Sequence, residues 1–264
     1  MFVAVTNSLR PPSFERAVLE PLSLFELSTF HAASPLFPFV ARGNGHPVLV
    51  IPGLVGSDHS TLPLRQLLSL RGHDAHGWLL GRNYGAHERV MGGMYDRLEQ
   101  LYEGSGQTVS LVGWSLGGIF ARELARDRPS MVRQVITLCA PFRFRDGDRG
   151  NASAVYDLVG PRVEPFVGRT RPEHERPPMP VPVTAVYTRT DGIVPWQACI
   201  ETAGGRRENV EVRSTHTGMG VNMLATIVVA DRLAQPEGRW RRFRPPLMLR
   251  AWYPRSSGWR PTVS

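Results

Sequence analysis

The sequence is poor in three things: it has no lysine, only two cysteines and no long run of apolar residues. All 31 basic residues of the 264-residue chain are therefore arginine, and with 23 acidic residues they give a net charge of +8. The use of arginine alone is as much a mark of genome-wide codon bias as of a physical choice. A solvated basic surface accounts for the charge as well as an anionic partner does, so the charge alone identifies no partner.

Cys139 and Cys199 lie far apart in the sequence, and neither belongs to a C-x-x-C pair or lies near a cluster of histidines. This spacing is not that of a structural zinc site, so we expect no metal. The two cysteines are expected to be buried free thiols. A disulfide between them stays open, because its formation depends on a distance that the sequence does not contain.

No stretch of the chain approaches the roughly eighteen apolar residues that a membrane-spanning helix needs. Residues 1–8 lack the basic start, the apolar stretch and the cleavage site of a secretory signal peptide. We therefore expect a cytoplasmic protein, with secretion by another route left open.

Length and composition fit one α/β domain with insertions, since 264 residues with 42% hydrophobic content can bury a full core. Short apolar runs typical of strands alternate with segments of helical periodicity. The strand candidates are residues 47–51, 73–80, 108–112, 134–139, 182–187 and 210–212, and the helix candidates are residues 61–70, 88–103, 116–126 and 221–233. This alternation predicts a mostly parallel sheet with helices on both faces.

The predicted α/β domain covers residues 45–233, with one insertion inside it and one further segment on either side. Residues 1–44 predict an N-terminal helical arm that packs on the domain. Residues 141–181 are rich in arginine and proline and lack periodicity, which favours a cap or lid over the strand ends, with a passive surface insertion as the alternative. Residues 234–264 form a tail rich in arginine and aromatic residues.

The tail carries seven arginines between Arg239 and Arg260, interleaved with aromatic residues. Such interleaving is typical of segments that bind an anionic membrane surface or nucleic acid. The tail has no long helical repeat, however, and Pro245-Pro246 interrupts it. We expect it to pack on the domain, we expect no nucleic-acid partner, and peripheral contact with a membrane is the alternative.

One motif organises the predicted domain: Gly113-Trp114-Ser115-Leu116-Gly117 reads G-x-S-x-G between a buried strand and a helix. A turn this tight holds its serine in strained backbone, and glycines on both sides remove Cβ clashes. The hydroxyl then stands near the positive end of a helix. The motif predicts Ser115 as a nucleophile, and the alternative is a glycine-rich turn with an incidental serine.

A serine nucleophile needs a base, and the base needs a third group to orient it. Asp191 follows the strand at 182–187, and His216 follows the strand at 210–212. Parallel strands bring their carboxyl ends to one edge of a sheet, so Ser115, Asp191 and His216 are expected to meet there as catalytic residues. Taken singly, Asp191 also suits a turn before Gly192, and His216 also suits a polar loop.

The negative charge that develops during acyl transfer needs two N–H donors. One is expected from Leu116, directly after the nucleophile, and the other from Leu54, with Gly53 as the alternative. Substrate contacts are expected from Gly53, His59 and Trp114. Five other histidines lack paired ligand spacing and are expected at the surface or in loops; they are His46, His73, His76, His87 and His174.

With these motifs the chain resembles the α/β-hydrolase superfamily, and within it bacterial serine esterases and lipases, over about residues 45–233. The motifs that carry the resemblance are residues 51–56, 113–118, 191–195 and 214–218. The resemblance implies a serine hydrolase that cleaves small-molecule or lipid carboxylic esters without a cofactor.

The chain departs from many lipases at Pro52-Gly53, where they have His-Gly. The same variant occurs in relatives that include acyltransferases. Acyl transfer to an alcohol by the same residues therefore stays open, beside a non-enzymatic scaffold that binds an anionic surface through the tail.

Overall fold

The computed structural model describes residues 11–22, 34–143, 173–202 and 204–255, together with residues 9, 28, 30 and 32. Within these residues, six strands form one parallel sheet in the order β2-β1-β3-β4-β5-β6. The strands are β1 Pro47–Ile51, β2 Asp74–Gly77, β3 Val109–Trp114, β4 Val132–Leu138, β5 Val183–Tyr187 and β6 Arg207–Glu211. The predicted α/β fold with a parallel sheet is confirmed, and all six carboxyl ends share one edge.

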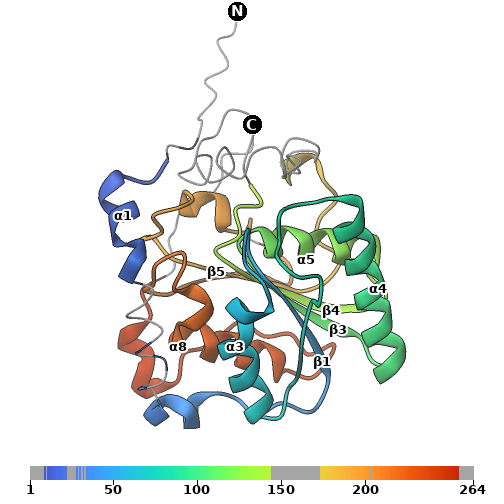
Figure 1. The fold of residues 1–264 in the computed structure, drawn as a ribbon. Coiled ribbons are helices and arrows are strands. Elements are labelled where there is room, and N and C mark those ends of the chain that lie inside the picture. The colour runs from blue at the N-terminus through green and yellow to red at the C-terminus, as the bar shows by residue number, and fades with distance from the viewer. Residues whose placement is uncertain are drawn as a thin grey trace, which may run out of the picture.

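Helices cover both faces of the sheet, with α3 and α8 on one side and α4 and α5 on the other (Figure 1). Their bounds are α3 Asp58–Leu70, α4 Glu88–Ser105, α5 Leu116–Asp127 and α8 Met223–Leu233. Side chains of β1 alternate between the two apolar layers, since Val48 and Val50 join one core cluster and Leu49 and Ile51 join the other. This burial on both faces explains why β1 is apolar without interruption.

Helix α3 begins at Asp58, three residues before the predicted start at residue 61. The Asp58 carboxylate accepts hydrogen bonds from the backbone N–H groups of Trp78 and Leu79, both at 3.0 Å. These bonds join the first turn of α3 to the end of β2, a long-range contact that local periodicity does not contain.

Short helices make up much of the remaining described chain. They are α1 Phe14–Leu19, η1 Glu20–Leu22, η2 Ser34–Phe39, η4 Glu173–Glu175, η5 Trp196–Cys199, η6 Met219–Val221 and η7 Leu247–Trp252. Helices α1 and η1 supply helical structure in the predicted N-terminal arm. None of the helices in the described ranges has the length and apolar character needed to cross a membrane.

The predicted lid-like insertion lies largely outside the described residues, which stop at residue 143 and resume at residue 173. Both ends of this gap contact Arg122, a fully buried residue of α5. Its guanidinium pairs with Glu173 and Glu201 and lies 3.8 Å from the centroid of the Phe142 ring. The insertion is thus joined to the domain beside the helix that follows Ser115, and its role as a lid stays a prediction.

The described part of the tail packs on the domain beside α8. The Tyr253 hydroxyl donates to the Leu224 carbonyl at 2.9 Å, and the Phe243 N–H donates to Glu208 at 2.7 Å. Leu249 and Tyr253 belong to the core cluster on the α8 side of the sheet. Leu247, Met248 and Trp252 remain exposed. Membrane contact through this segment stays a prediction.

Two histidines that were expected at the surface or in loops lie in loops but are buried. His46 is fully buried, with Nδ1 2.7 Å from the Asn44 side-chain oxygen and Nε2 3.0 Å from Ser110 Oγ. His73 is buried beside it, with the ring centroids 6.3 Å apart. Burial, with the positive charge of Arg133, lowers the pKa of His46 to about 3. The folded protein therefore keeps this imidazole neutral.

Replacement of His46 by glutamine should reduce the acid sensitivity of the fold. An unfolded histidine titrates near about 6.5, so below that pH the unfolded chain binds a proton that folded His46 does not bind. Stability is therefore lost as pH falls from about 6.5 toward 3. Between pH 7 and pH 5 the unfolding free energy, measured in urea, should fall by about 2 kcal/mol less in His46→Gln than in the wild type. The exposed His59→Gln should keep the wild-type difference, and equal behaviour of all three proteins contradicts the assignment.

Candidate active site

Ser115 occupies the turn between β3 and α5, with φ 51° and ψ −121°. Its N–H donates to the Leu138 carbonyl at 2.8 Å, which fixes the turn to the neighbouring strand. Among the described residues, the non-glycine residues with positive φ are Val55, Leu79, Ser115 and Cys139, and they follow β1, β2, β3 and β4 in turn. Backbone strain is thus gathered at the carboxyl edge of the sheet, where functional sites commonly hold it.

The glycines of the motif allow backbone to pack directly on backbone. A Cβ on Gly113 would come within 3.0 Å of the Gly117 carbonyl, and a Cβ on Gly117 would come within 3.0 Å of the Ile51 carbonyl. The end of β1, the end of β3 and the first turn of α5 therefore meet without side chains between them.

The structure brings Ser115, His216 and Asp191 together in one chain of hydrogen bonds. Ser115 Oγ lies 3.0 Å from His216 Nε2, and His216 Nδ1 lies 2.7 Å from Asp191 Oδ2. The other Asp191 oxygen accepts the N–H groups of Ile193 at 2.9 Å and Val194 at 2.8 Å. Asp191 and His216 are only 1% and 5% exposed. The carboxylate is thus held by its own turn while it faces the imidazole.

Burial alone would lower the pKa of His216, but the charge of Asp191 and its hydrogen bond outweigh that effect, and the charge of Glu20 adds to them. The net result is a pKa raised above the ordinary histidine value of 6.5. With Nδ1–H directed at Asp191, Nε2 of the neutral ring is left to accept the Ser115 proton. This is the geometry that a serine nucleophile, a base and an orienting carboxylate would require.

Both cysteines are free and buried, as expected. Cys139 Sγ lies within 4.8 Å of ligand atoms of Asp191 and His216. Burial raises the pKa of the Cys139 thiol well above its usual value, and the charge of Asp191 adds to the shift. A protonated thiol beside a carboxylate suits hydrogen bonding, whereas zinc binding needs the thiolate.

The loop after β1 lies against Ser115. An ideal Cβ on Gly53 would be 3.2 Å from Ser115 Cβ. Leu54 is half-buried and packs on the core cluster of the α4 and α5 side. Within the described part of the chain, neither the Leu54 N–H nor the Leu116 N–H has a hydrogen-bond acceptor. Among these residues, neither donor has a competing protein acceptor.

Asn83 shapes this loop, and sequence reasoning missed it. Asn83 is fully buried, and its side-chain amide donates to the Pro52 carbonyl at 2.8 Å. Its backbone carbonyl accepts the Val55 N–H at 2.7 Å, and its N–H donates to the Gly56 carbonyl at 2.8 Å. The only local signal was an asparagine in the glycine-flanked segment after the second strand candidate.

The expected substrate-contact residues have different surroundings. The half-buried Trp114 donates its indole N–H to the His216 carbonyl at 3.1 Å, and its ring packs against Gly220. Trp114 thus supports the loop that carries His216. His59 is exposed in the first turn of α3. The role of Gly53, His59 and Trp114 in substrate binding stays a prediction.

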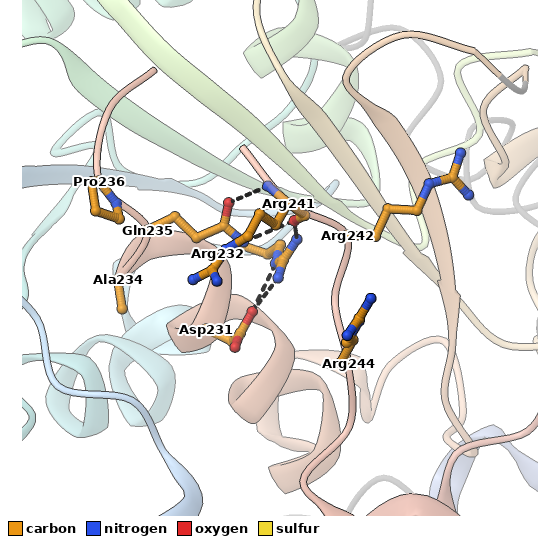
Figure 2. Close-up of a pocket in the computed structure, with 8 residues that line it drawn as sticks. All are labelled: Asp231, Arg232, Ala234, Gln235, Pro236, Arg241, Arg242 and Arg244. Carbon is orange, nitrogen blue, oxygen red and sulfur yellow. Dashed lines mark hydrogen bonds and ion pairs between the residues drawn. The ribbon is translucent and has the colours of Figure 1, made fainter. Parts of the chain in front are cut away.

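A cavity of about 580 Å³ lies at the C-terminal end of α8 and is lined mainly by tail residues (Figure 2). Arg232 is already engaged there, because it pairs with Asp231 and with Glu208. The Arg242 side chain extends away from Asp231 in Figure 2, so the arginines do not converge on one point. The lining residue Arg232 pairs with Glu208 near the amino end of β6, whereas Ser115 follows the carboxyl end of β3, so the cavity is no part of the site.

Solved structures with lipase and hydrolase names share this architecture. Lipase B of Aspergillus fumigatus superposes with a TM-score of 0.57 and 18% identity, over 73% of this chain and 53% of the lipase. This is the α/β-hydrolase fold. Lipase BlEst2 of Bacillus licheniformis in its mature form shares the α/β-hydrolase fold with a TM-score of 0.56 and 16% identity, over 74% of this chain and 94% of the lipase.

The pyrethroid hydrolase PytH shares the α/β-hydrolase fold with a TM-score of 0.54 and 17% identity, over 74% of this chain and 100% of the hydrolase. This chain thus spans about half the length of the fungal lipase and nearly all of the other two proteins. No family model and no curated protein matches the sequence. At these identities the likeness establishes the fold.

Gly117→Ala should destabilise the α/β-hydrolase fold. The new Cβ would press on the Ile51 carbonyl, which is backbone and cannot rotate away, so we expect a loss of about 1–3 kcal/mol in the free energy of unfolding. Gly92→Ala is the matched control. Gly92 lies inside α4 with open space around it, so alanine there should stabilise the protein by about 0.5–1 kcal/mol. Urea denaturation measures both, and a shift of the same sign in the two variants contradicts the packing argument.

Proposed function

We propose that this protein hydrolyses carboxylic esters, with Ser115 as nucleophile, His216 as general base and acid, and Asp191 as the group that orients His216. One observation carries the proposal: Ser115 Oγ, both His216 ring nitrogens and Asp191 Oδ2 form a continuous line of hydrogen bonds of 3.0 Å and 2.7 Å. A serine at a strained strand-to-helix turn, hydrogen-bonded to a buried imidazole–carboxylate pair, serves acyl transfer on this fold.

In the proposed reaction, Ser115 Oγ attacks the ester carbonyl carbon while its proton passes to His216 Nε2. The tetrahedral intermediate collapses, the bond to the alcohol oxygen breaks, and His216 gives its proton to the leaving alcohol. Water then attacks the acyl-serine ester and transfers a proton to His216. The acid leaves as the second product when that proton returns to Ser115 Oγ. Asp191 stabilises the imidazolium in both halves of the cycle.

The Leu54 and Leu116 N–H groups are proposed to hold the negative oxygen of both intermediates. Their support is the free state of both donors among the described residues and the approach of Gly53 to Ser115. Leu116 also opens α5, so the positive end of the helix faces the developing charge. Donors of this kind contribute on the order of 3 kcal/mol each to the transition state.

A carboxylic ester is the proposed substrate class because the side chains, the two backbone amides and water are enough to cleave it by the steps above. Of the three solved structures compared above, two are named lipases and one a pyrethroid hydrolase, which supports small-molecule or lipid esters. No cofactor takes part in the proposed steps.

Ser115→Ala should abolish hydrolysis of p-nitrophenyl esters, since turnover in a comparable triad falls by about a million-fold without its serine. The exposed Ser69→Ala in α3 makes the same chemical change away from the site and should keep wild-type rates. A series of short to long acyl chains separates esterase from lipase preference, and added alcohols report acyl transfer. Equal rates in the wild type and Ser115→Ala would remove Ser115 from the mechanism.

The rate should also depend on pH through His216. The base must be neutral, and Asp191 raises its pKa above 6.5, so kcat/KM should rise with pH through a single titration above 6.5 and then level off. Asp191→Asn should shift this titration to lower pH and reduce kcat by about four orders of magnitude. Measured pH–rate profiles of both proteins test this, and a flat wild-type profile from pH 5 to 8 argues against His216 as base.

A further inference from the structure

We propose that Glu20, in the N-terminal arm, is a positioning residue that holds the Asp191 loop and the His216 loop together for catalysis. The inference rests on the proposed function, because it assigns a task toward the same catalytic line. Glu20 begins η1, directly after α1, and Figure 1 shows α1 outside the sheet and its two layers of helices. The arm also lies outside the region of resemblance to known hydrolases.

One carboxylate oxygen of Glu20 joins the two loops. Glu20 Oε1 accepts the backbone N–H of Gly192 at 2.8 Å and the backbone N–H of His216 at 3.0 Å. Gly192 directly follows Asp191, the proposed orienting residue, and His216 is the proposed base. A single oxygen of Glu20 therefore holds the residue next to Asp191 and the backbone of His216 itself. A shift of either loop would therefore stretch a bond to the same oxygen.

The second oxygen extends this contact to Thr217. Glu20 Oε2 accepts the Thr217 N–H at 2.9 Å and the Thr217 hydroxyl at 2.7 Å. The same hydroxyl also lies 3.0 Å from the backbone carbonyl of Glu20. The arm thus holds the His216 loop by main chain and side chain together.

The Asp191 loop is built to let the arm approach this closely. A Cβ on Gly192 would come within 3.0 Å of the Arg16 carbonyl and of the Ala17 nitrogen. Glycine at position 192 therefore lets the backbone of α1 lie against the turn that follows Asp191. This second contact is independent of the Glu20 carboxylate and fixes the arm at the same place.

The hydrogen bonds of the Glu20 carboxylate offset the free-energy cost of its burial. The Glu20 side chain is buried, and a buried carboxylate is costly unless its lone pairs are filled. Here four donors fill them, and hydrogen bonds to a charged group are about twice as strong as neutral ones. Removal of Glu20 would leave the N–H groups of Gly192 and His216 without this acceptor, in a region closed to water.

The charge of Glu20 acts on the base as well. Among the residues that the structure describes, the ionisable groups that face His216 are Asp191 from the loop after β5, Glu20 from the arm and the Cys139 thiol after β4. Both carboxylates favour the imidazolium, so Glu20 adds to Asp191 in raising the pKa of His216. Loss of the Glu20 charge should therefore lower that pKa, an effect that a purely structural role would not produce.

Glu20→Gln in the full-length protein tests the proposal. Glutamine keeps one accepting oxygen but places an NH₂ group where Oε2 accepts from Thr217. With an acyl-chain length that the wild type hydrolyses, we expect kcat to fall about ten- to hundredfold, in line with the loss of charged hydrogen bonds. We expect KM to change less than about threefold, since the Glu20 carboxylate bonds to Gly192, His216 and Thr217 and is proposed to act through their loops. The acidic limb of the pH–rate profile should move to lower pH.

Two further variants separate the effect of the Glu20 charge from the effect of its side-chain length. Glu15→Gln removes the same charge from an exposed position of α1 and should leave kcat and the pH profile unchanged. Glu20→Asp keeps the charge but is one methylene shorter, so kcat should fall while the acidic limb stays closer to the wild-type position. Near-UV circular dichroism checks folding, and if Glu20→Gln does not fold, Glu20→Asp and its kcat decide the question.

Titration of the His216 ring by NMR, with the signal assigned by its loss in His216→Gln, gives a readout that needs no substrate. A lower His216 pKa in Glu20→Gln than in Glu15→Gln supports the proposal. Wild-type kcat and an unmoved His216 titration in a folded Glu20→Gln would overturn it. If the wild type hydrolyses no ester, the proposed function fails by itself, and the NMR comparison still reports whether Glu20 acts on His216.

Discussion

The close approach of α5 to the ends of β1 and β3 is the contact on which the site depends. Because Gly113 and Gly117 present only backbone, the first turn of α5 lies against the Ile51 carbonyl. That contact sets Ser115 at positive φ, and it brings the loop after β1 within van der Waals reach of the serine. The nucleophile and its nearest N–H donors are therefore positioned by main-chain packing, which is less variable than side-chain packing.

Around this centre, polar side chains hold the loops that leave the sheet. Asp58 accepts two N–H groups after β2, and Asp191 accepts the N–H groups of its own turn. The Asn83 side-chain amide donates to the Pro52 carbonyl in the loop after β1. Glu20 likewise accepts backbone N–H groups, one from each of two loops. Exit loops of a parallel sheet have backbone donors without ladder partners, and buried donors need acceptors. The acidic residues at this edge supply them.

The sheet, its helices and the meeting of Ser115, Asp191 and His216 were predictable, since each residue follows a strand and parallel strands end at one edge. Asn83 and Glu20 were not predictable. Glu20 contacts residues 172 to 197 positions away, and nothing in its short, proline-interrupted segment marks it as buried. The burial of His46 in its loop was not predictable for the same reason, because it depends on Ser110, 64 positions away. Periodicity reports the partner layer of an element and not the partner of one polar side chain.

The use of acids in the interior also bears on the basic surface. Among the described residues, five carboxylates are buried, namely Glu20, Asp191, Glu201, Glu208 and Glu211, against two arginines, Arg122 and Arg232. Each buried arginine binds two carboxylates through its planar fork, a task for which a lysine would be a poor substitute. With more acids than bases withdrawn from water, the solvent-facing charge of the described part of the chain is more positive than its composition implies. The positive surface charge thus follows in part from the burial of carboxylates in the interior. It requires no anionic partner to explain it.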